Sequence, residues 1–124
     1  MNVVDSSGWL EYLADGPNAD FFAKPIIATA DLIIPTVSLY EVFKRVVQQR
    51  GEDDALQAVA LMQQGTVIEL SASLALSAAR ISLTEKIPMA DSIILATARA
   101  YSATLWSQDA DFEHISGVKY TPKK

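Results

Sequence analysis

The sequence contains no cysteine and only one histidine, His114. Without a thiol group, the chain cannot form a disulfide framework, a thiolate zinc site, an iron–sulfur cluster or a cysteine nucleophile. Because His114 has no second histidine with which to share a metal ion, we interpret it as a surface or packing residue. Any metal ion must therefore be bound mainly through oxygen atoms.

A long apolar run is also missing. The densest stretch, Ile93–Ala98, is closed by Arg99 and is far shorter than the roughly 18 apolar residues that a membrane span needs. The apolar stretch at the amino terminus ends at Asp5, before the core of a signal peptide could form. The sequence therefore predicts a cytoplasmic protein with no membrane contact.

Positive charge is in short supply, because the 124 residues include 15 acidic and 10 basic side chains and carry a net charge of -5. This balance repels a polyanion at long range, so nucleic-acid binding would need a bound cation or a local cluster of lysine and arginine. With 50% hydrophobic and 20% charged residues, the composition is typical of a globular protein. We expect a single domain that spans residues 1–124.

Short β-favouring runs alternate with segments of helical period along the chain. Each parallel connection requires a crossover, so this alternation predicts an α/β fold, a three-layer α/β/α sandwich with a central, mostly parallel five-stranded sheet. Gly16, Gly51 and Gly65 mark the breaks between elements. The final residues, 122–124, are interpreted as a frayed basic tail. The expected strands contain residues 3–4, 32–34, 66–68, 104–106 and 118–120.

Acidic residues stand at the expected carboxyl ends of the strands, where open parallel sheets bind ligands. Asp5 follows the first strand directly, and Asp109 comes just after the strand that contains Trp106. Glu41 and Asp91 fall early in helices that begin near prolines, so both are expected at the same rim of the sheet. The four acids could therefore share one crevice.

Three of these acids have a purely structural alternative. Asp5 could cap the helix that follows it, and Asp109 could open a tight turn. Glu41 could close a capping box with Ser38 or pair with Arg45 on an exposed helix face. Taken one at a time, these structural roles are the more common ones for such acids.

Asp91 is different because its helix is apolar on most faces and has no neighbouring lysine or arginine to pair with it. A carboxylate that faces a buried region costs several kcal/mol unless it is paired or bound to a metal ion. Stabilisation by the helix dipole is the alternative. The position of Asp91 therefore favours a functional role.

At these acids the chain resembles the PIN-domain nucleases, and in particular the VapC-type toxins of toxin–antitoxin pairs. The resemblance rests on four segments in order, and it covers nearly the whole chain. In the last segment Ser107 stands where the family usually has threonine, which keeps the hydroxyl group. The segments are Val3–Ser7, Ser38–Val42, Pro88–Ala98 and Ser107–Phe112.

The resemblance implies a metal-dependent endoribonuclease with Asp5, Glu41, Asp91 and Asp109 as catalytic and metal-binding residues. An all-oxygen set of ligands suits Mg²⁺ or Mn²⁺. The resemblance further implies polar support from Ser6 and Ser107, with Asp111 as a less certain member. Candidates for contacts with the RNA backbone are Lys44, Arg45, Arg50 and Lys86.

The resemblance also implies partners. A cognate antitoxin would fill the cleft and place a basic side chain among the acids, and the toxin itself would form a homodimer. The substrate would be RNA, but the sequence does not indicate whether transfer, ribosomal or messenger RNA is cut.

Two other functions stay open at this point. A signalling receiver domain shares the chain length and an acidic Mg²⁺ site, but it needs adjacent acids after its first strand, whereas here Ser6 follows Asp5. It also needs a lysine after its fifth strand, and none lies between Lys86 and Lys119. The second alternative is a non-catalytic PIN-like binding module.

Overall fold

The sheet determines where the acidic residues lie. The computed structural model describes residues 1–124, and its five strands form one sheet in the order β3-β2-β1-β4-β5. All four pairings are parallel, so the predicted sheet is confirmed and is wholly rather than mostly parallel. The strands are β1 (Asn2–Val4), β2 (Leu32–Pro35), β3 (Thr66–Ile68), β4 (Thr104–Ser107) and β5 (Val118–Tyr120).

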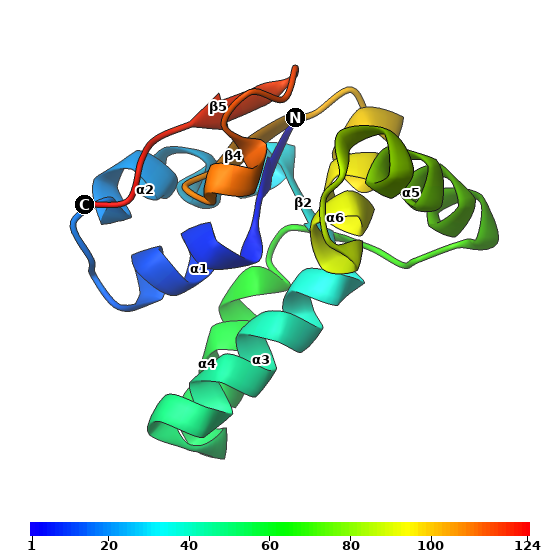
Figure 1. The fold of residues 1–124 in the computed structure, drawn as a ribbon. Coiled ribbons are helices and arrows are strands. Elements are labelled where there is room, and N and C mark those ends of the chain that lie inside the picture. Colours follow the sequence, from blue (N-terminus) through cyan, green and yellow to red (C-terminus); the bar gives the residue numbers. More distant parts are fainter.

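Six α-helices and two short 3-10 turns connect the strands (Figure 1). In Figure 1, α3 and α4 form a pair that projects below the sheet, α5 and α6 stand to one side, and α1 and α2 lie on the other. None of these helices has the length and apolar character needed to cross a membrane. The helices are α1 (Ser6–Leu13), α2 (Ala19–Ile27), α3 (Thr36–Arg50), α4 (Glu52–Met62), α5 (Ala72–Glu85) and α6 (Met89–Ala100), and the turns are η1 (Thr29–Asp31) and η2 (Ala110–Phe112).

Alternate residues of the central strands face opposite layers, as the period of a β-strand requires. Val3 of β1 packs in a cluster with Ile94 and Leu95 of α6, whereas the next residue, Val4, packs in a cluster with Trp9 of α1 and Phe22 of α2. Both faces of β1 are therefore covered, which confirms the three-layer arrangement. It also explains why the strand reads as a short apolar run without alternation.

The breaks between elements follow the punctuation of the sequence. Gly51 has φ 94°, a conformation that favours glycine, and it separates α3 from α4. Gly8 is required for another reason, because a Cβ atom there would lie 2.5 Å from Cε1 of Phe22. This close approach lets the start of α1 pack directly on α2, beside the end of β1.

At Pro122 the carboxyl terminus differs from the frayed tail predicted for residues 122–124. The backbone N–H of Thr121 donates to the carbonyl of Ser107 at 3.0 Å. The carbonyl of Pro122 accepts a hydrogen bond from Nδ2 of Asn18, also at 3.0 Å. The chain is therefore held as far as Pro122, by contacts that the basic composition of residues 122–124 could not indicate.

The strand order reverses between β1 and β4, since β2 and β3 lie on one side of β1 and β4 and β5 on the other. Loops that leave two such neighbouring strands diverge, and a crevice opens at their carboxyl ends. Asp5 and Asp109 follow β1 and β4, so the fold places both at this crevice.

Candidate functional site

The four predicted acids line one cavity of about 240 Å³. They come from four separate elements: the end of β1, the second turn of α3, the first turn of α6 and the loop after β4. Only one lining residue is hydrophobic. The lining consists of Asp5, Ser6, Ser7, Leu10, Glu41, Arg45, Asp91 and Asp109.

Asp5 is buried, with 2% of its surface exposed, and its carboxylate is fully engaged by hydrogen-bond donors. Oδ1 accepts from the backbone N–H of Gly8 at 2.9 Å, which makes Asp5 the N-cap of α1. Oδ2 accepts from Oγ of Ser107 at 2.6 Å, and Oγ of Ser7 lies 2.9 and 3.0 Å from the two oxygens. The capping alternative is therefore correct, and it coexists with a place in the cavity.

A second chain of hydrogen bonds orders the loop after β4. Oγ of Ser107 accepts from the backbone N–H of Asp109 at 2.9 Å, so one hydroxyl joins this loop to Asp5. Oδ1 of Asp109 in turn accepts from the backbone N–H of Asp111 at 2.9 Å and caps η2, which is the predicted turn role. Serine thus suffices where the family motif has threonine.

Glu41 fills neither of its structural alternatives. The N-cap of α3 is Pro35 without any side-chain capping bond, and no carboxylate oxygen of Glu41 lies within 4 Å of the Arg45 guanidinium. Instead, Oε1 of Glu41 accepts a hydrogen bond of 2.6 Å from Oγ of Ser6. The contact spans 35 positions of the chain and ties α3 to the start of α1.

The pKa of Asp91 reflects how close the other acids lie. Its pKa rises from 3.8 to about 7, first because of burial and then because of the charges of Asp109, Asp5, Asp111 and Glu41. Each of these neighbours disfavours the charged form of Asp91. Four other carboxylates therefore lie near enough to raise the pKa of one side chain.

Burial and hydrogen bonding have opposite effects on the pKa of Asp5. Burial raises its pKa from 3.8 to about 6, while the hydrogen bonds from Ser107, Gly8 and Ser7 oppose that rise. The nearby charge of Asp109 adds a smaller increase. Even with these donors, the site disfavours a full set of negative charges.

No basic side chain forms an ion pair with these acids. The single ion pair with N and O atoms within 4 Å joins His114 to Glu113, and the His114 side chain is 90% exposed, so of its two predicted roles the surface one is correct. Carboxylate oxygens of Asp91, Asp109 and Asp111 lie within 4.8 Å of one another. A cluster of hard oxygen donors with an uncompensated charge fits a divalent cation such as Mg²⁺ or Mn²⁺.

The sequence profile of the PIN-domain family matches residues 3–118. The chain belongs to the PIN-domain family. This confirms the family prediction made from the motifs, and the receiver-domain alternative is wrong. The strand order agrees, because receiver domains have the order 2-1-3-4-5 and this PIN domain has 3-2-1-4-5. No curated protein sequence matches the chain significantly.

Solved structures with the same fold include proteins of toxin–antitoxin systems. A toxin-antitoxin complex from Klebsiella pneumoniae has a TM-score of 0.82 and 21% identity, and the match covers 100% of this chain and 99% of that chain. VapC20 from Mycobacterium tuberculosis, described as a Sarcin-Ricin loop cleaving toxin, has a TM-score of 0.78 and 17% identity over 94% of this chain and 95% of that one. VapBC2 from Rickettsia felis, bound to a promoter DNA fragment, has a TM-score of 0.72 and 16% identity over 99% and 98%. At such identities the likeness is one of fold.

The basic residues named as RNA-contact candidates do not gather at the acids of this PIN domain. Arg45, one turn after Glu41 on α3, is the only one that lines the acidic cavity. Nζ of Lys44 instead lies 5.7 Å from the ring centroid of Tyr40. Arg50 lines a neighbouring groove, and Lys86 is the left-handed C-cap of α5, with φ 58°.

The structure adds to the predicted roles of two residues. Ser7 belongs to the first motif but is not a predicted site residue, and its hydroxyl contacts both oxygens of Asp5. Asp111 is predicted as a supporting residue, and its carboxylate lies within 4.8 Å of those of Asp91 and Asp109. The signal for both was present, since each lies two residues from a predicted ligand, but spacing alone does not fix the direction of a side chain in a turn.

Proposed function

We propose that this PIN domain is a Mg²⁺- or Mn²⁺-dependent endoribonuclease and acts as the toxin of a toxin–antitoxin pair in the cytoplasm. The observation that carries the proposal is the convergence of Asp5, Glu41, Asp91 and Asp109 on one cavity without a basic partner in contact. The fold shared with VapC20, which is described as cleaving the Sarcin-Ricin loop, supports the choice of RNA as substrate.

In this proposal Asp5, Glu41, Asp91 and Asp109 would supply the oxygen ligands of the cation. Asp111 would be a further ligand, because its carboxylate lies with those of Asp91 and Asp109. A bound Mg²⁺ or Mn²⁺ would offset the charge of the scissile phosphate and activate a water molecule. The protein's own contribution is to hold oxygen ligands in fixed directions. Ser107 and Ser7 fix Asp5, and Ser6 fixes Glu41.

The basic candidates have a separate role in the proposal. Arg45 is the only cation that lines the cavity, so it is placed to contact a phosphate group that bridges the acids and solvent. Lys44, Arg50 and Lys86 are exposed and would contact RNA farther along its backbone. Such contacts would also counter the long-range repulsion from the net charge of -5.

Cleavage of total cellular RNA in vitro tests the function. With Mg²⁺ or Mn²⁺ the purified chain should produce discrete fragments, and a chelator should stop the reaction. Mapping the ends of the fragments would identify the substrate. A chain that binds Mn²⁺ and RNA but leaves RNA intact would contradict the nuclease and favour the non-catalytic PIN-like module.

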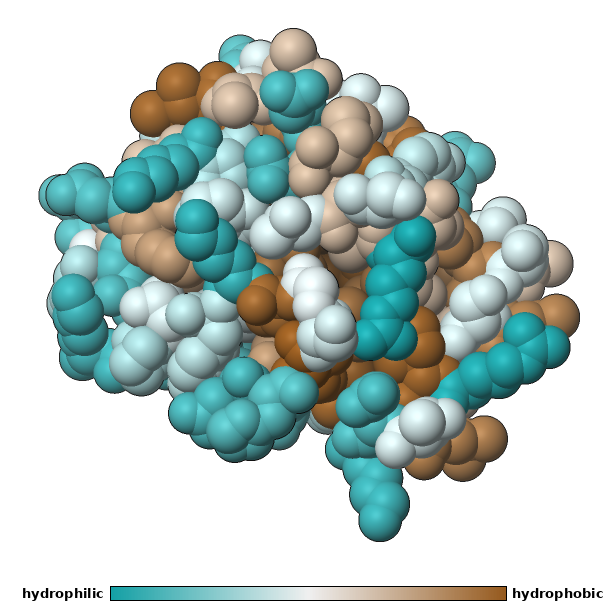
Figure 2. Space-filling view, turned by 90° about the horizontal axis from the view of Figure 1, so that it is seen from above, coloured by the Kyte–Doolittle hydropathy of each residue, from teal (hydrophilic) through white to brown (hydrophobic).

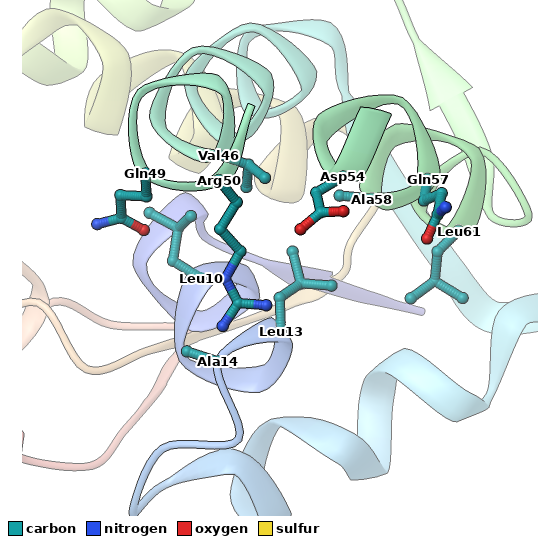
Figure 3. Close-up of a pocket in the computed structure, with 10 residues that line it drawn as sticks. All are labelled: Leu10, Leu13, Ala14, Val46, Gln49, Arg50, Asp54, Gln57, Ala58 and Leu61. Carbon is teal, nitrogen blue, oxygen red and sulfur yellow. The ribbon is translucent and has the colours of Figure 1, made fainter. Parts of the chain in front are cut away.

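A cognate antitoxin is the proposed partner, and a groove beside the acids could receive it (Figure 3). The groove has a volume of about 320 Å³ between α1, α3 and α4, with leucines along its walls. In Figure 3, Arg50 reaches across it towards Ala14, and Asp54 lies on the opposite side. Leu10 lines both this groove and the acidic cavity, so a peptide in the groove would lead directly to the acids.

The antitoxin assignment has a direct test. A Leu13→Glu substitution puts a charge on the wall of the groove, outside the acidic cavity, and should weaken binding of the co-expressed antitoxin while RNA cleavage is kept. Pull-down of the tagged toxin would measure this. Undiminished binding by the variant would exclude the groove as the antitoxin site.

A homodimer is the other proposed assembly, formed through α5 and α6. Leu83 and Met89 are 82% and 74% exposed, and they line a hollow together with the small residues Ala75, Ala78 and Ala79. No charged residue lines the hollow. A twofold contact between identical surfaces must be self-complementary, and protruding side chains beside a hollow on one face can meet that requirement. In Figure 2, hydrophobic atoms are exposed at the right-hand edge, the side on which α5 lies.

Light scattering after size-exclusion chromatography measures the oligomeric state. The wild-type chain should have the mass of a dimer at micromolar concentration, and Leu83→Glu should have the mass of a monomer. A monomeric wild type would contradict the homodimer.

A further inference from the structure

Asn18 stands at the N-cap position of α2 but makes no capping hydrogen bond. Asparagine is common at this position because its side-chain oxygen accepts a bond from the first helical turn. Here the residue is 3% exposed, and Nδ2 donates instead to Oε1 of Gln108 at 2.9 Å and to the carbonyl of Pro122 at 3.0 Å. These partners are 90 and 104 positions away, so the side chain serves a distant contact rather than its own helix.

Gln108 lies between Ser107 and Asp109, yet it does not line the acidic cavity. Its side chain is buried, and Nε2 donates to the carbonyl of Ser7 at 3.5 Å. The loop after β4 is therefore held from two directions. Ser107 binds Asp5 on the side of the cavity, and Gln108 binds the segment of Ser7 and the start of α2 behind it.

This arrangement adds a buried contact between two parts of the site that the pairing of β1 with β4 and the hydrogen bond from Ser107 to Asp5 already join. Asp5 and Ser7 begin α1, whereas Asp109 begins η2, more than 90 residues later. A buried amide that loses its partner leaves an unsatisfied polar atom, and the local structure relaxes to recover a bond. For the loop after β4, such a relaxation would move Asp109 relative to Asp5.

We propose that Asn18 and Gln108 are positioning residues that hold the loop of Ser107 and Asp109 in register with Asp5. The proposal rests on the proposed function of the acidic cavity and adds residues to it that contact neither metal nor RNA. Groups that orient metal ligands from behind typically contribute 10- to 100-fold to metal affinity or activity. The pair from α2 and the loop after β4 therefore belongs to the machinery of the site.

The test uses the full chain with Asn18→Ser, Gln108→Ala and both together. Serine is too short to reach Gln108 but caps a helix well, so Asn18→Ser should keep α2 stable while breaking the contact. Binding of Mn²⁺ to the metal-free protein is measured by titration calorimetry, and kcat and KM are measured with an RNA substrate. Each single variant should bind Mn²⁺ about tenfold more weakly and lose kcat with KM nearly unchanged.

The double variant should be no worse than the single ones, because the two side chains act as one unit. Ala55→Gly is the matched control, since it removes a buried methyl group and weakens α4 outside the site. It should leave Mn²⁺ affinity unchanged.

Two results would overturn the proposal. Wild-type Mn²⁺ affinity and kcat in both single variants would show that the contact does not position the acids. Equal losses in Ala55→Gly would show that the effect comes from general stability. A wild-type chain that neither binds Mn²⁺ nor cleaves RNA would instead contradict the proposed function, and the positioning role would fall with it.

Discussion

Two acidic regions of this protein differ in how they are built. Glu52, Asp53 and Asp54 are consecutive and exposed, and they occupy the first turn of α4. The acids of the cavity are spread over the chain from position 5 to position 109, and they meet only in the folded state. The second group includes a carboxylate, Asp91, whose pKa is raised to about 7.

The comparison teaches that convergence and burial make a candidate site, whereas density of charge along the sequence does not. Acids in the first turn of a helix are stabilised by the helix dipole and by water, so the group on α4 needs no cation. The acids of the cavity have no basic side chain within ion-pair distance, and burial raises the pKa values of Asp5 and Asp91. Only the second group should respond strongly to a divalent ion.

Loss of activity should separate the two regions most clearly. Asp91→Asn or Asp5→Asn should lower the rate of RNA cleavage by roughly 100-fold or more, because each removes a charge that faces the proposed cation. Asp53→Asn on α4 should leave the rate within about twofold. The rates are measured with a fluorescent RNA substrate, and circular dichroism verifies the fold. Full activity in Asp91→Asn would show that this cavity acid, like the acids of α4, is not needed for cleavage.

The gain in thermal stability on adding a metal ion should also distinguish the cavity acids from the acids of α4. An ion that binds only the folded chain, at about 100 times its Kd, adds roughly 2.7 kcal/mol to the free energy of unfolding. The melting temperature should therefore rise by several degrees when Mn²⁺ is added to the metal-free wild type. Asp91→Asn should lose this rise. A variant with Glu52, Asp53 and Asp54 changed to amides should keep it, and if that variant loses the rise instead, the cation binds on α4.

Stability should also depend on pH through the two cavity acids with raised pKa values, Asp5 and Asp91. The pKa values of Asp5 and Asp91 are raised in the folded state to about 6 and about 7, from the value of 3.8 that applies to the unfolded chain. Between these values the two carboxyl groups are protonated in the folded chain and ionised in the unfolded chain. Their contribution therefore stabilises the metal-free protein as pH falls from about 7 to about 4, and this stabilisation is lost as pH rises.

Thermal melts of wild type and Asp91→Asn at pH 5 and pH 8 measure this effect. Without metal, the variant should be the more stable protein at pH 8, and its advantage should shrink at pH 5. Saturating Mg²⁺ at pH 8 should reverse the order. Equal curves at both pH values would mean that Asp91 carries no unfavourable charge.

The smallest expected effect is the change in stability caused by a substitution in α4. Asp53→Asn should change the free energy of unfolding by no more than about 1 kcal/mol, since it removes one exposed charge at a helix N-terminus. Urea denaturation measures the change. A much larger loss would indicate a buried contact for this group, against its exposed position.

Much of the fold could be predicted because it depends on local patterns. The runs at β1 and β4 are apolar and short, and each is followed directly or closely by an acid, so the position of Asp5 and Asp109 at one rim follows from the rules of parallel sheets. The apolar helix α6 made Asp91 conspicuous for the same reason. Local pattern therefore located the cavity.

The contacts that refine the site were not predictable in the same way. Asn18 and Gln108 are 90 positions apart, and nothing in either local sequence indicates the other. The hydrogen bond from Nδ2 of Asn18 to the carbonyl of Pro122 likewise anchors a residue for which the basic composition of the tail predicted fraying. Such contacts depend on how finished elements pack, and a single sequence carries no local signal for that packing.

An anomalous difference map from crystals soaked in Mn²⁺ tests the central claim most directly. The account predicts a peak roughly 2 Å from carboxylate oxygens of Asp91 and Asp109, at the rim between β1 and β4, and none at the first turn of α4. A map with no peak among the cavity acids, or with its peak at Glu52–Asp54, would contradict the account.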